Sequence, residues 1–316
     1  MSRLWCVYSD EYFVDMGDHV FPVAKYRLVH ARLREEGTVP EEAVAAPQPA
    51  TEEQLRRAHT ARYLSELRRL AEPGWGYVTG DTPISPDILA KAILGAGGTI
   101  LTCELALQRG VGLHLSGGFH HAGPDSGEGF CYVNDAAVAI RELQARGRAN
   151  GRLAIGRAAV VDLDVHQGNG TARIFAGDDT VFTFSMHEEW NYPPVKPPSD
   201  WDIGLPSGCE DDTYLAHLER ALPEVLSRGR PGLVVYLAGA DPYERDQLGG
   251  LALTLEGLRE RDALVLGACR ERGVPVAILL AGGYAEDTAD TVEIHVQTAR
   301  EARRCLDATR AAAPVA

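Results

Sequence analysis

Apolar runs alternate with longer helix-like segments along most of the chain. The mainly apolar runs span residues 4–9, 111–116, 158–164, 180–186, 233–241 and 276–284. The segments with helical periodicity lie at about 52–70, 86–109, 134–146, 211–228 and 255–272. Strands that are apolar on both faces and separated by helices are typical of a mostly parallel sheet covered on each side. The pattern therefore predicts an open α/β fold with helices on both faces.

No break in composition divides the chain into two parts. Stretches rich in glycine, proline or polar residues occur at 41–54, 72–86 and 191–208, and they predict surface loops. The segment after Arg304 is rich in alanine, and we expect it to fray from about residue 305. We predict one domain over residues 1–316.

Five of the six apolar runs end in polar, reactive or glycine-rich residues. From the run at 111–116 onward, these endings read GGFHH, DLDVH, SMH, AGAD and AGGY. In open parallel sheets, ligands bind beyond the carboxyl ends of the strands. We therefore interpret the five endings as parts of one functional site.

Charge and composition narrow the class of protein. The 316 residues carry a net charge of −14, and 45% of them are hydrophobic. Direct binding of nucleic acid is not expected, because it needs a basic surface. The acidity fits cationic substrates such as lysine side chains or polyamines, and equally a role in solubility alone.

Targeting and redox signals are also absent from the sequence. We find no stretch long and apolar enough to cross a bilayer and no signal peptide, so we expect a cytoplasmic protein without membrane contact. The six cysteines have no C-x-x-C spacing, which predicts scattered buried thiols. Nothing in the sequence indicates the oligomeric state.

The segment DLDVH predicts a metal site at a strand end. If the strand continues through it, Asp162, Asp164 and His166 lie on one side, because side chains alternate along a strand. A carboxylate and an imidazole can bind a divalent metal, and Asp241 is the natural third ligand. The simpler alternative is a strand end with hydrogen-bonded carboxylates and no metal. Taken with the other strand endings, the metal site is the better hypothesis.

Two further strand endings offer acid–base and hydrogen-bonding groups. His120 and His121 follow two glycines, and a histidine with a pKa near 7 can take a proton and return it. Tyr284 follows AGG and offers an uncharged donor for a developing oxyanion. Alone, each motif is more often structural; beside a metal motif, both favour catalysis.

The segment GFCYVND carries residues whose chemistry is less specific. Phe130 suits the wall of an apolar slot, although core packing is the ordinary role of a phenylalanine. Cys131 resembles a nucleophile, but a metal site needs none, and we interpret this thiol as a bystander.

Together these motifs resemble the zinc-dependent histone deacetylase family, most closely its class IV branch and bacterial relatives. The similarity extends from about Val7 into the helix beyond Tyr284. It includes AHTARYL, GDTPIS, GGFHHAGPDSGEGFCYVNDAAVAI, VVDLDVHQGNGT, GADPYERDQLGGLALT and AGGY. The resemblance implies a single domain of the arginase-like fold with a sheet of about eight strands. It also implies a hydrolase that removes an acetyl or longer fatty acyl group from the amine of lysine.

The resemblance further assigns roles to residues. One Zn²⁺ per chain would be held by Asp164, His166 and Asp241. The catalytic residues would be His121 as the general base toward metal-bound water, His120 oriented by Asp162, Tyr284 holding the oxyanion, and Asn169. Because Asn169 stands where some members have aspartate, it should raise the pKa of His121 less.

The resemblance also implies where the substrate and a structural cation bind. The substrate-binding residues would be Gly129, Phe130, Tyr192, Leu248 and, at the rim, Asp81. A structural monovalent cation, usually potassium, would be bound by Asp162, Asp164, His166, Ser185 and Met186. The substrate would be an acylated lysine in a peptide or protein, or an acylated polyamine.

Two rival functions lead to different expectations. A two-metal hydrolase of the arginase kind needs extra carboxylates two residues after His166 and Asp241, where this chain has Gly168 and Tyr243. A catalytically silent acyl-lysine binder would not need the complete set of metal-binding and catalytic side chains. We therefore expect a working one-metal enzyme.

Overall fold

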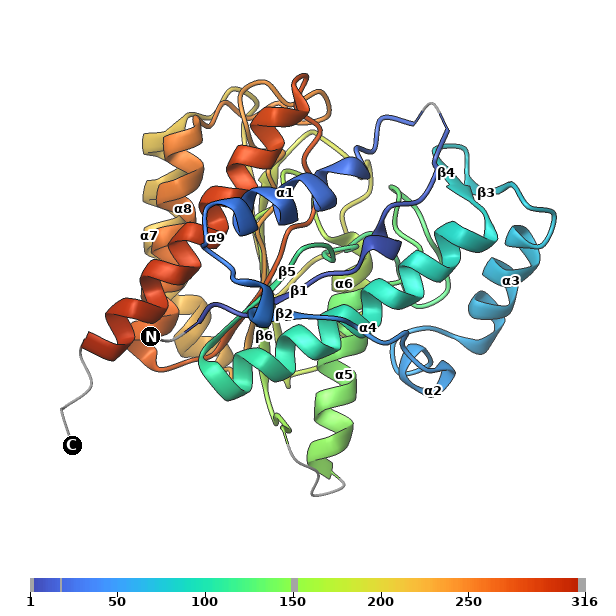
Figure 1. Ribbon diagram of the computed structural model, residues 1–316, viewed down its shortest axis with the longest axis horizontal. Helices are drawn as coiled ribbons and strands as arrows, with labels where there is room; N and C mark the ends of the chain where they lie inside the picture. The colour runs from blue at the N-terminus through green and yellow to red at the C-terminus, as the bar shows by residue number, and fades with distance from the viewer. Residues whose placement is uncertain (1–2, 18, 149–152, 312–316) are drawn as a thin grey trace.

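The computed structural model describes residues 3–17, 19–148 and 153–311. Its centre is a sheet of eight strands in the order β2-β1-β5-β10-β9-β6-β7-β8, and all neighbouring strands are parallel (Figure 1). The strands are β1 (Cys6–Val7), β2 (Val44–Ala45), β5 (Val111–His114), β6 (Ala158–Asp162), β7 (Val181–Glu188), β8 (Trp201–Leu205), β9 (Val234–Leu237) and β10 (Val276–Leu279). The predicted single α/β domain with about eight strands is confirmed.

Helices cover both faces of this sheet, because the central strands are apolar on both sides. One layer is formed by α1 (Ala24–Glu35), α7 (Asp211–Gly229), α8 (Leu255–Arg272) and α9 (Thr288–Ala311). The other contains α4 (Pro86–Arg109) and α5 (Asp135–Arg148), with α2 (Glu52–Leu55), α3 (Ala61–Ala71) and α6 (Asn169–Phe175) beside them (Figure 1). The strands of this sheet other than the edge strands β2 and β8 are buried along their whole length, so the hydrophobic core lies on both sides of the sheet.

Several predicted elements are shorter or more divided than expected. The run at 233–241 forms strand only over β9, and the run at 276–284 only over β10. The predicted helix at 52–70 is two helices, α2 and α3, each with its own threonine N-cap. In each case the residues outside the regular element belong to loops or caps, where periodicity gives no signal.

The three predicted loops each contain short elements. Two short 3-10 turns, η1 (Asp10–Tyr12) and η2 (Glu41–Ala43), flank the first part of the fold, and β2 follows η2 directly. A separate antiparallel hairpin, β3 (Gly76–Thr79) and β4 (Thr82–Ile84), occupies the second loop, and β8 the third. Strands of two to five residues are too short to be found by alternation.

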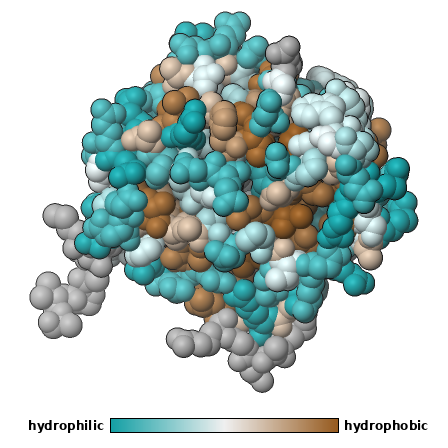
Figure 2. All heavy atoms as spheres, turned by 45° about the vertical axis from the view of Figure 1, so that its right-hand side comes forward, coloured by the Kyte–Doolittle hydropathy of each residue, from teal (hydrophilic) through white to brown (hydrophobic). Residues whose placement is uncertain are grey.

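The helix α4 corrects one expectation about membranes. Within the described residues it is long and apolar enough to cross a bilayer, and 78% of its most apolar window is buried inside the fold. Its apolar character is explained by packing against α5, β5 and β10. On the face of the molecule drawn in Figure 2, hydrophobic residues form patches between hydrophilic ones.

The C-terminal end and the cysteines also bear on the predictions. Helix α9 continues past Arg304 to Ala311, and 312–316 lie outside the described residues. Fraying after about residue 305 stays a prediction. All six cysteines are free and buried, as expected.

Two glycines of α4 should respond oppositely to the same substitution. A Cβ at Gly97 would lie 1.8 Å from the carbonyl oxygen of Gln48, whereas one at Gly95 would meet Phe119 at 3.9 Å. We expect Gly97→Ala to destabilise the protein by about 1–3 kcal/mol through overpacking. Gly95→Ala should stabilise it by up to about 1 kcal/mol, because alanine favours the helix. Urea denaturation of both variants tests this, and equal shifts would contradict it.

Candidate active site

The predicted catalytic and metal-binding residues follow the carboxyl ends of four neighbouring strands. The strands β5, β10, β9 and β6 are adjacent in the sheet order. Their carboxyl ends lead into GGFHH, AGGY, AGAD and DLDVH respectively. Because parallel strands end at the same edge, the four loops meet there. The structure thus brings these predicted endings into one site.

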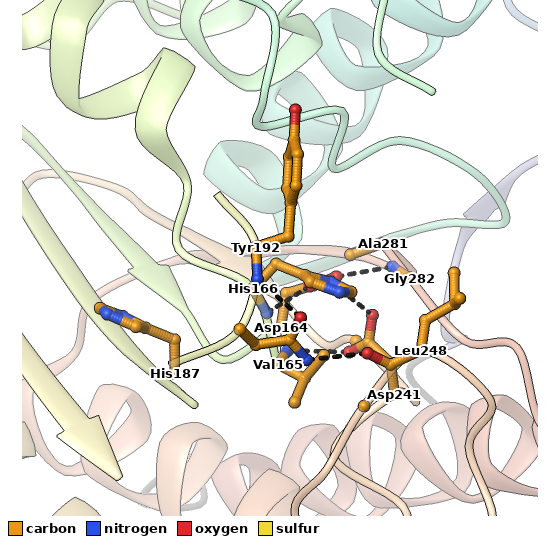
Figure 3. A network of polar contacts seen from close by, with 12 residues as sticks. Asp164, Val165, His166, His187, Tyr192, Asp241, Leu248, Ala281 and Gly282 are labelled. Atoms are coloured by element: carbon orange, nitrogen blue, oxygen red, sulfur yellow. Dashed lines mark hydrogen bonds and ion pairs between the residues drawn. The ribbon is translucent and has the colours of Figure 1, made fainter. Parts of the chain in front are cut away.

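Asp164, His166 and Asp241 converge at the centre of this edge. One potential ligand atom from each residue lies within 4.8 Å of the others. The Nδ1 atom of His166 is 3.0 Å from an Asp164 oxygen and 3.5 Å from Oδ2 of Asp241. Figure 3 shows the three side chains directed toward one another, with Gly282 beside them. Within the described part of the chain this is the one such group of three, so a second metal has no comparable set of ligands.

The surroundings of the triad fit a bound cation. The Oδ2 atom of Asp241 is buried and has no hydrogen-bond partner. A Cβ at Gly282 would lie 1.8 Å from this oxygen and 2.6 Å from an Asp164 oxygen, so only glycine leaves the carboxylates this close to the backbone. Two carboxylates and an imidazole, with one oxygen left unsatisfied, are suitable ligands for a divalent metal such as zinc.

The pKa shifts within the triad also fit a bound cation. Burial and the nearby Asp164 carboxylate raise the pKa of Asp241 to about 7. Burial would lower the pKa of His166, but the hydrogen-bonded carboxylate of Asp164 and the nearby carboxylate of Asp241 raise it to about 10. Both shifts reflect a buried negative site that favours a positive charge, which a metal ion supplies in place of protons.

The strand β6 ends at Asp162, so alternation does not explain how DLDVH is arranged. Beyond it, the backbone N–H of Asp164 donates to Asp162, and that of His166 donates to Asp164. These local bonds form a tight loop that directs Asp164 and His166 to the triad. Asp162 instead accepts from His120, 2.7 Å away. The common side was predicted for a strand that continues through DLDVH, and this condition is not met.

The two adjacent histidines have different partners and opposite pKa shifts. Burial disfavours a charge on His120, but the carboxylates of Asp162 and Asp164 outweigh it and raise its pKa to about 9. His121 has its Nδ1 atom 2.7 Å from the side-chain oxygen of Asn169. Burial, reinforced by the neighbouring His120 and His166, lowers the pKa of His121 well below its ordinary value. One ring thus favours the charged form and the other the neutral form.

Tyr284 stands at the edge of the same cavity. It is buried, and burial together with the charges of Asp241 and Asp164 raises its pKa well above 10. The phenol therefore stays protonated and able to donate a hydrogen bond. Its backbone N–H donates to Asp246, and the Nζ atom of Lys25 donates to the carbonyl of Ala281 nearby.

Of the predicted substrate-wall residues, Gly129 and Phe130 line a narrow cavity at the triad, whereas Tyr192 lies outside this lining. Phe130 packs edge-on against Tyr284, and Tyr192 packs edge-on against His121. Gly129 lies between them, where a Cβ would meet the His121 ring at 2.5 Å. The cavity has a volume of about 20 Å³, and its lining includes Phe130, both histidines, Tyr284 and two triad members.

The remaining predicted residues lie farther out. Asp81 is exposed, and its backbone carbonyl accepts from His19, whose ring packs against Phe130. Leu248 lies beside Asp241 in Figure 3, outside the residues that line the cavity. Ser185 is paired in register with Asp162 on the neighbouring strand, and Met186 follows it, fully buried.

Several site residues were missed by sequence reasoning. Arg261 of α8 is fully buried, and it donates to the backbone carbonyl of Gly239, two residues before Asp241. Asp135 accepts the backbone N–H groups of Gly118 and Phe119 and so fixes the loop before His120. Glu128 contacts Asn169 and Tyr192. Glu128 and Asp135 could have been found from the sequence, because both lie within GEGFCYVND, the segment that contains Phe130. Arg261 lies in no such motif.

Comparisons with known proteins identify the family. A histone deacetylase domain model matches residues 19–299. Histone deacetylase 2 of Arabidopsis thaliana is 32% identical over 92% of this chain and 77% of its own length. A probable deacetylase of Archaeoglobus fulgidus is 30% identical over 90% of this chain and 82% of its own. A solved histone deacetylase homologue from Aquifex aeolicus has a TM-score of 0.80 at 23% identity, covering 96% of this chain and 84% of that one.

The fold and the family match define a hydrolase that acts on amide bonds. The chain belongs to the histone deacetylase family. This outcome confirms the predicted resemblance and argues against the silent binder as the explanation of the site.

Removing one carboxylate of the triad should abolish metal binding. We expect Asp241→Ala to lose its divalent metal, because only Asp164 and His166 would remain as ligands. Elemental analysis of the purified variant and of wild type measures this. The matched control is Asp307→Ala, which removes an exposed aspartate paired with Arg303 on α9 and should retain the metal. A full metal complement in Asp241→Ala would contradict the assignment.

Proposed function

We propose that the protein is a zinc-dependent deacylase that removes an acyl group from the side-chain amine of lysine in a peptide or protein. One observation carries this proposal: the triad, the histidine pair and Tyr284 converge on a single narrow cavity. One Zn²⁺ per chain would be held by Asp164, His166 and Asp241. When bound, it supplies a Lewis acid for the amide carbonyl and lowers the pKa of a water molecule from ~15.7 to about 7.

The histidine pair supplies the proton transfers. His121 is kept neutral by burial and by its neighbours, so it can accept a proton from water at Nε2 while Nδ1 is occupied by Asn169. His120 is held protonated by Asp162 and stabilises negative charge that develops beside it. The proton taken by His121 then passes to the departing amine, which leaves as a neutral product.

Tyr284 stabilises the oxyanion formed from the acyl carbonyl. Its protonated phenol is a preorganised donor in a buried site, where a hydrogen bond to developing charge is strong. Phe130 and Tyr192 form apolar walls for the lysine side chain, Gly129 offers its carbonyl to the substrate amide, and Leu248 borders the triad. Asp81, which is exposed, would hold the substrate backbone.

Both acetyl and longer acyl groups are candidates. The cavity of about 20 Å³ holds little more than one water molecule, so it has to widen for an acyl-lysine of any chain length. Phe21 and Phe119 also line this cavity. An acetylated polyamine remains the second candidate substrate, because the acidic chain suits a cationic amine.

We further propose a structural potassium site next to the triad. Asp162, Asp164 and His166 would contribute to it from the loop after β6, with Ser185 and Met186 from β7. Support comes from the register that pairs Asp162 with Ser185 and from the full burial of this region. A cation here would offset the two neighbouring carboxylates.

The phenol of Tyr284 can be tested alone. Tyr284→Phe should lower kcat by about 10²–10³-fold, because an oxyanion donor is lost, while zinc content stays at the wild-type level. Tyr8→Phe, which removes a phenol bonded to Asp10 outside the cavity, is the control and should turn over normally. Wild-type turnover in Tyr284→Phe would remove this residue from the mechanism.

A substrate panel tests reaction and preference together. Lysine peptides and polyamines bearing acetyl, butyryl and myristoyl groups are incubated with zinc-loaded protein, with and without a zinc chelator. We expect chelator-sensitive release of an acyl group from lysine peptides, and the relative rates give the preferred chain length. No hydrolysis of any substrate would refute the proposed function, and hydrolysis of polyamines alone would refute acyl-lysine as the substrate.

A further inference from the structure

Glu128 lies directly behind the partner of His121. Its Oε1 atom accepts from the side-chain amide nitrogen of Asn169 and from Nη1 of Arg173, each at 2.8 Å. Its Oε2 atom accepts from the hydroxyl of Tyr192, also at 2.8 Å. One carboxylate thus contacts the groups that support the histidine and a substrate wall.

The chemistry of Glu128 determines which end of Asn169 faces His121. An amide presents an oxygen at one end and a nitrogen at the other, so by itself it can support either tautomer of a histidine. An ionised carboxylate only accepts hydrogen bonds, so the amide nitrogen of Asn169 must face Glu128. Its oxygen then faces Nδ1 of His121, which must carry the proton. The Nε2 atom is left as the free acceptor.

Arg173 and the local backbone keep Glu128 in this position. The guanidinium of Arg173 forms an ion pair with the carboxylate, and the side chain of Glu128 is only 25% exposed. Glu128 begins a tight turn in which its backbone carbonyl accepts from the N–H of Cys131. Gly129 and Phe130, inside that turn, both have positive φ angles of 55° and 65°. The backbone geometry therefore fixes where the carboxylate can reach.

We propose that Glu128 is a positioning residue that orients Asn169 and thereby holds His121 in the Nδ1–H tautomer. Glu128 also supplies the negative charge that Asn169 lacks, and this charge is separated from His121 by one additional hydrogen-bonded residue. This inference rests on the proposed function for its effect on turnover, whereas the tautomer itself is a property of the protein alone.

A carboxylate–amide exchange tests the proposal through kinetics. Glu128→Gln replaces the acceptor by an amide that no longer fixes Asn169. We expect kcat to fall by about 10–100-fold, part of the roughly 10²–10⁴-fold that a correctly positioned general base contributes. Asn169→Asp alone places two carboxylates against each other and should also lower kcat. The double variant Glu128→Gln/Asn169→Asp puts a carboxylate against His121 and an amide behind it, so it should recover at least about tenfold over Glu128→Gln.

Controls separate positioning from general damage. All variants should retain wild-type zinc content, and the loss in Glu128→Gln should fall more on kcat than on KM. Glu66→Gln removes another carboxylate paired with arginine, on α3, and should leave kcat unchanged. Wild-type kcat in Glu128→Gln, or a double variant no better than Glu128→Gln, would overturn the proposal.

A spectroscopic measurement decides the tautomer without any substrate. In zinc-loaded protein with ¹⁵N-labelled histidine, NMR should show the Nδ1–H tautomer for His121, with the signal assigned by its loss in His121→Gln. Glu128→Gln should shift this signal toward the other tautomer. An Nε2–H tautomer in wild type would overturn the inference, even if the enzyme hydrolyses acyl-lysine. If no acyl-amine is hydrolysed, the proposed function fails, while this spectrum still decides the role of Glu128.

Discussion

The carboxylates of Asp164 and Asp241 face a common point inside the protein, and they have little reason to do so unless a cation lies between them. Removing a charge from water costs several kcal/mol per ion, and two like charges add repulsion. Here an oxygen of Asp241 has no hydrogen-bond partner at all. The loops around Asp241 are built to hold the two carboxylates close together. Gly282 leaves room for both of them, and Arg261 donates a hydrogen bond to the backbone that precedes Asp241.

The histidine pair shows how neighbouring groups give two identical side chains different properties. The carboxylates of Asp162 and Asp164 favour the charged form of His120, whereas burial and the neighbouring His120 and His166 favour the neutral form of His121. Environments that push two pKa values apart can divide acid and base roles within one active site. The proposed mechanism uses this difference between the two rings.

Much of this site could be predicted because its residues follow apolar strands that sequence patterns detect. His120, His121, Asp164, His166, Asp241 and Tyr284 all come from such strand ends, and the fold class follows from the same alternation. Lys25 and Arg261 could not be predicted, since they reach the site from helices distant in sequence. The arrangement of DLDVH was also beyond prediction, because β6 stops at Asp162 and local hydrogen bonds then direct the chain.

The place of β10 in the sheet has a consequence for how the protein is made. This strand lies between β5 and β9, although it is the last strand of the chain. During synthesis, the two halves of the sheet have no hydrogen bonds to each other until residues 276–279 leave the ribosome. Domains fold as units once their chain is available, and pairings of distant segments form slowly. Until β10 is made, the part of the sheet that leads to Asp164, His166 and Asp241 thus lacks its hydrogen-bonded link to the part that leads to His120 and His121.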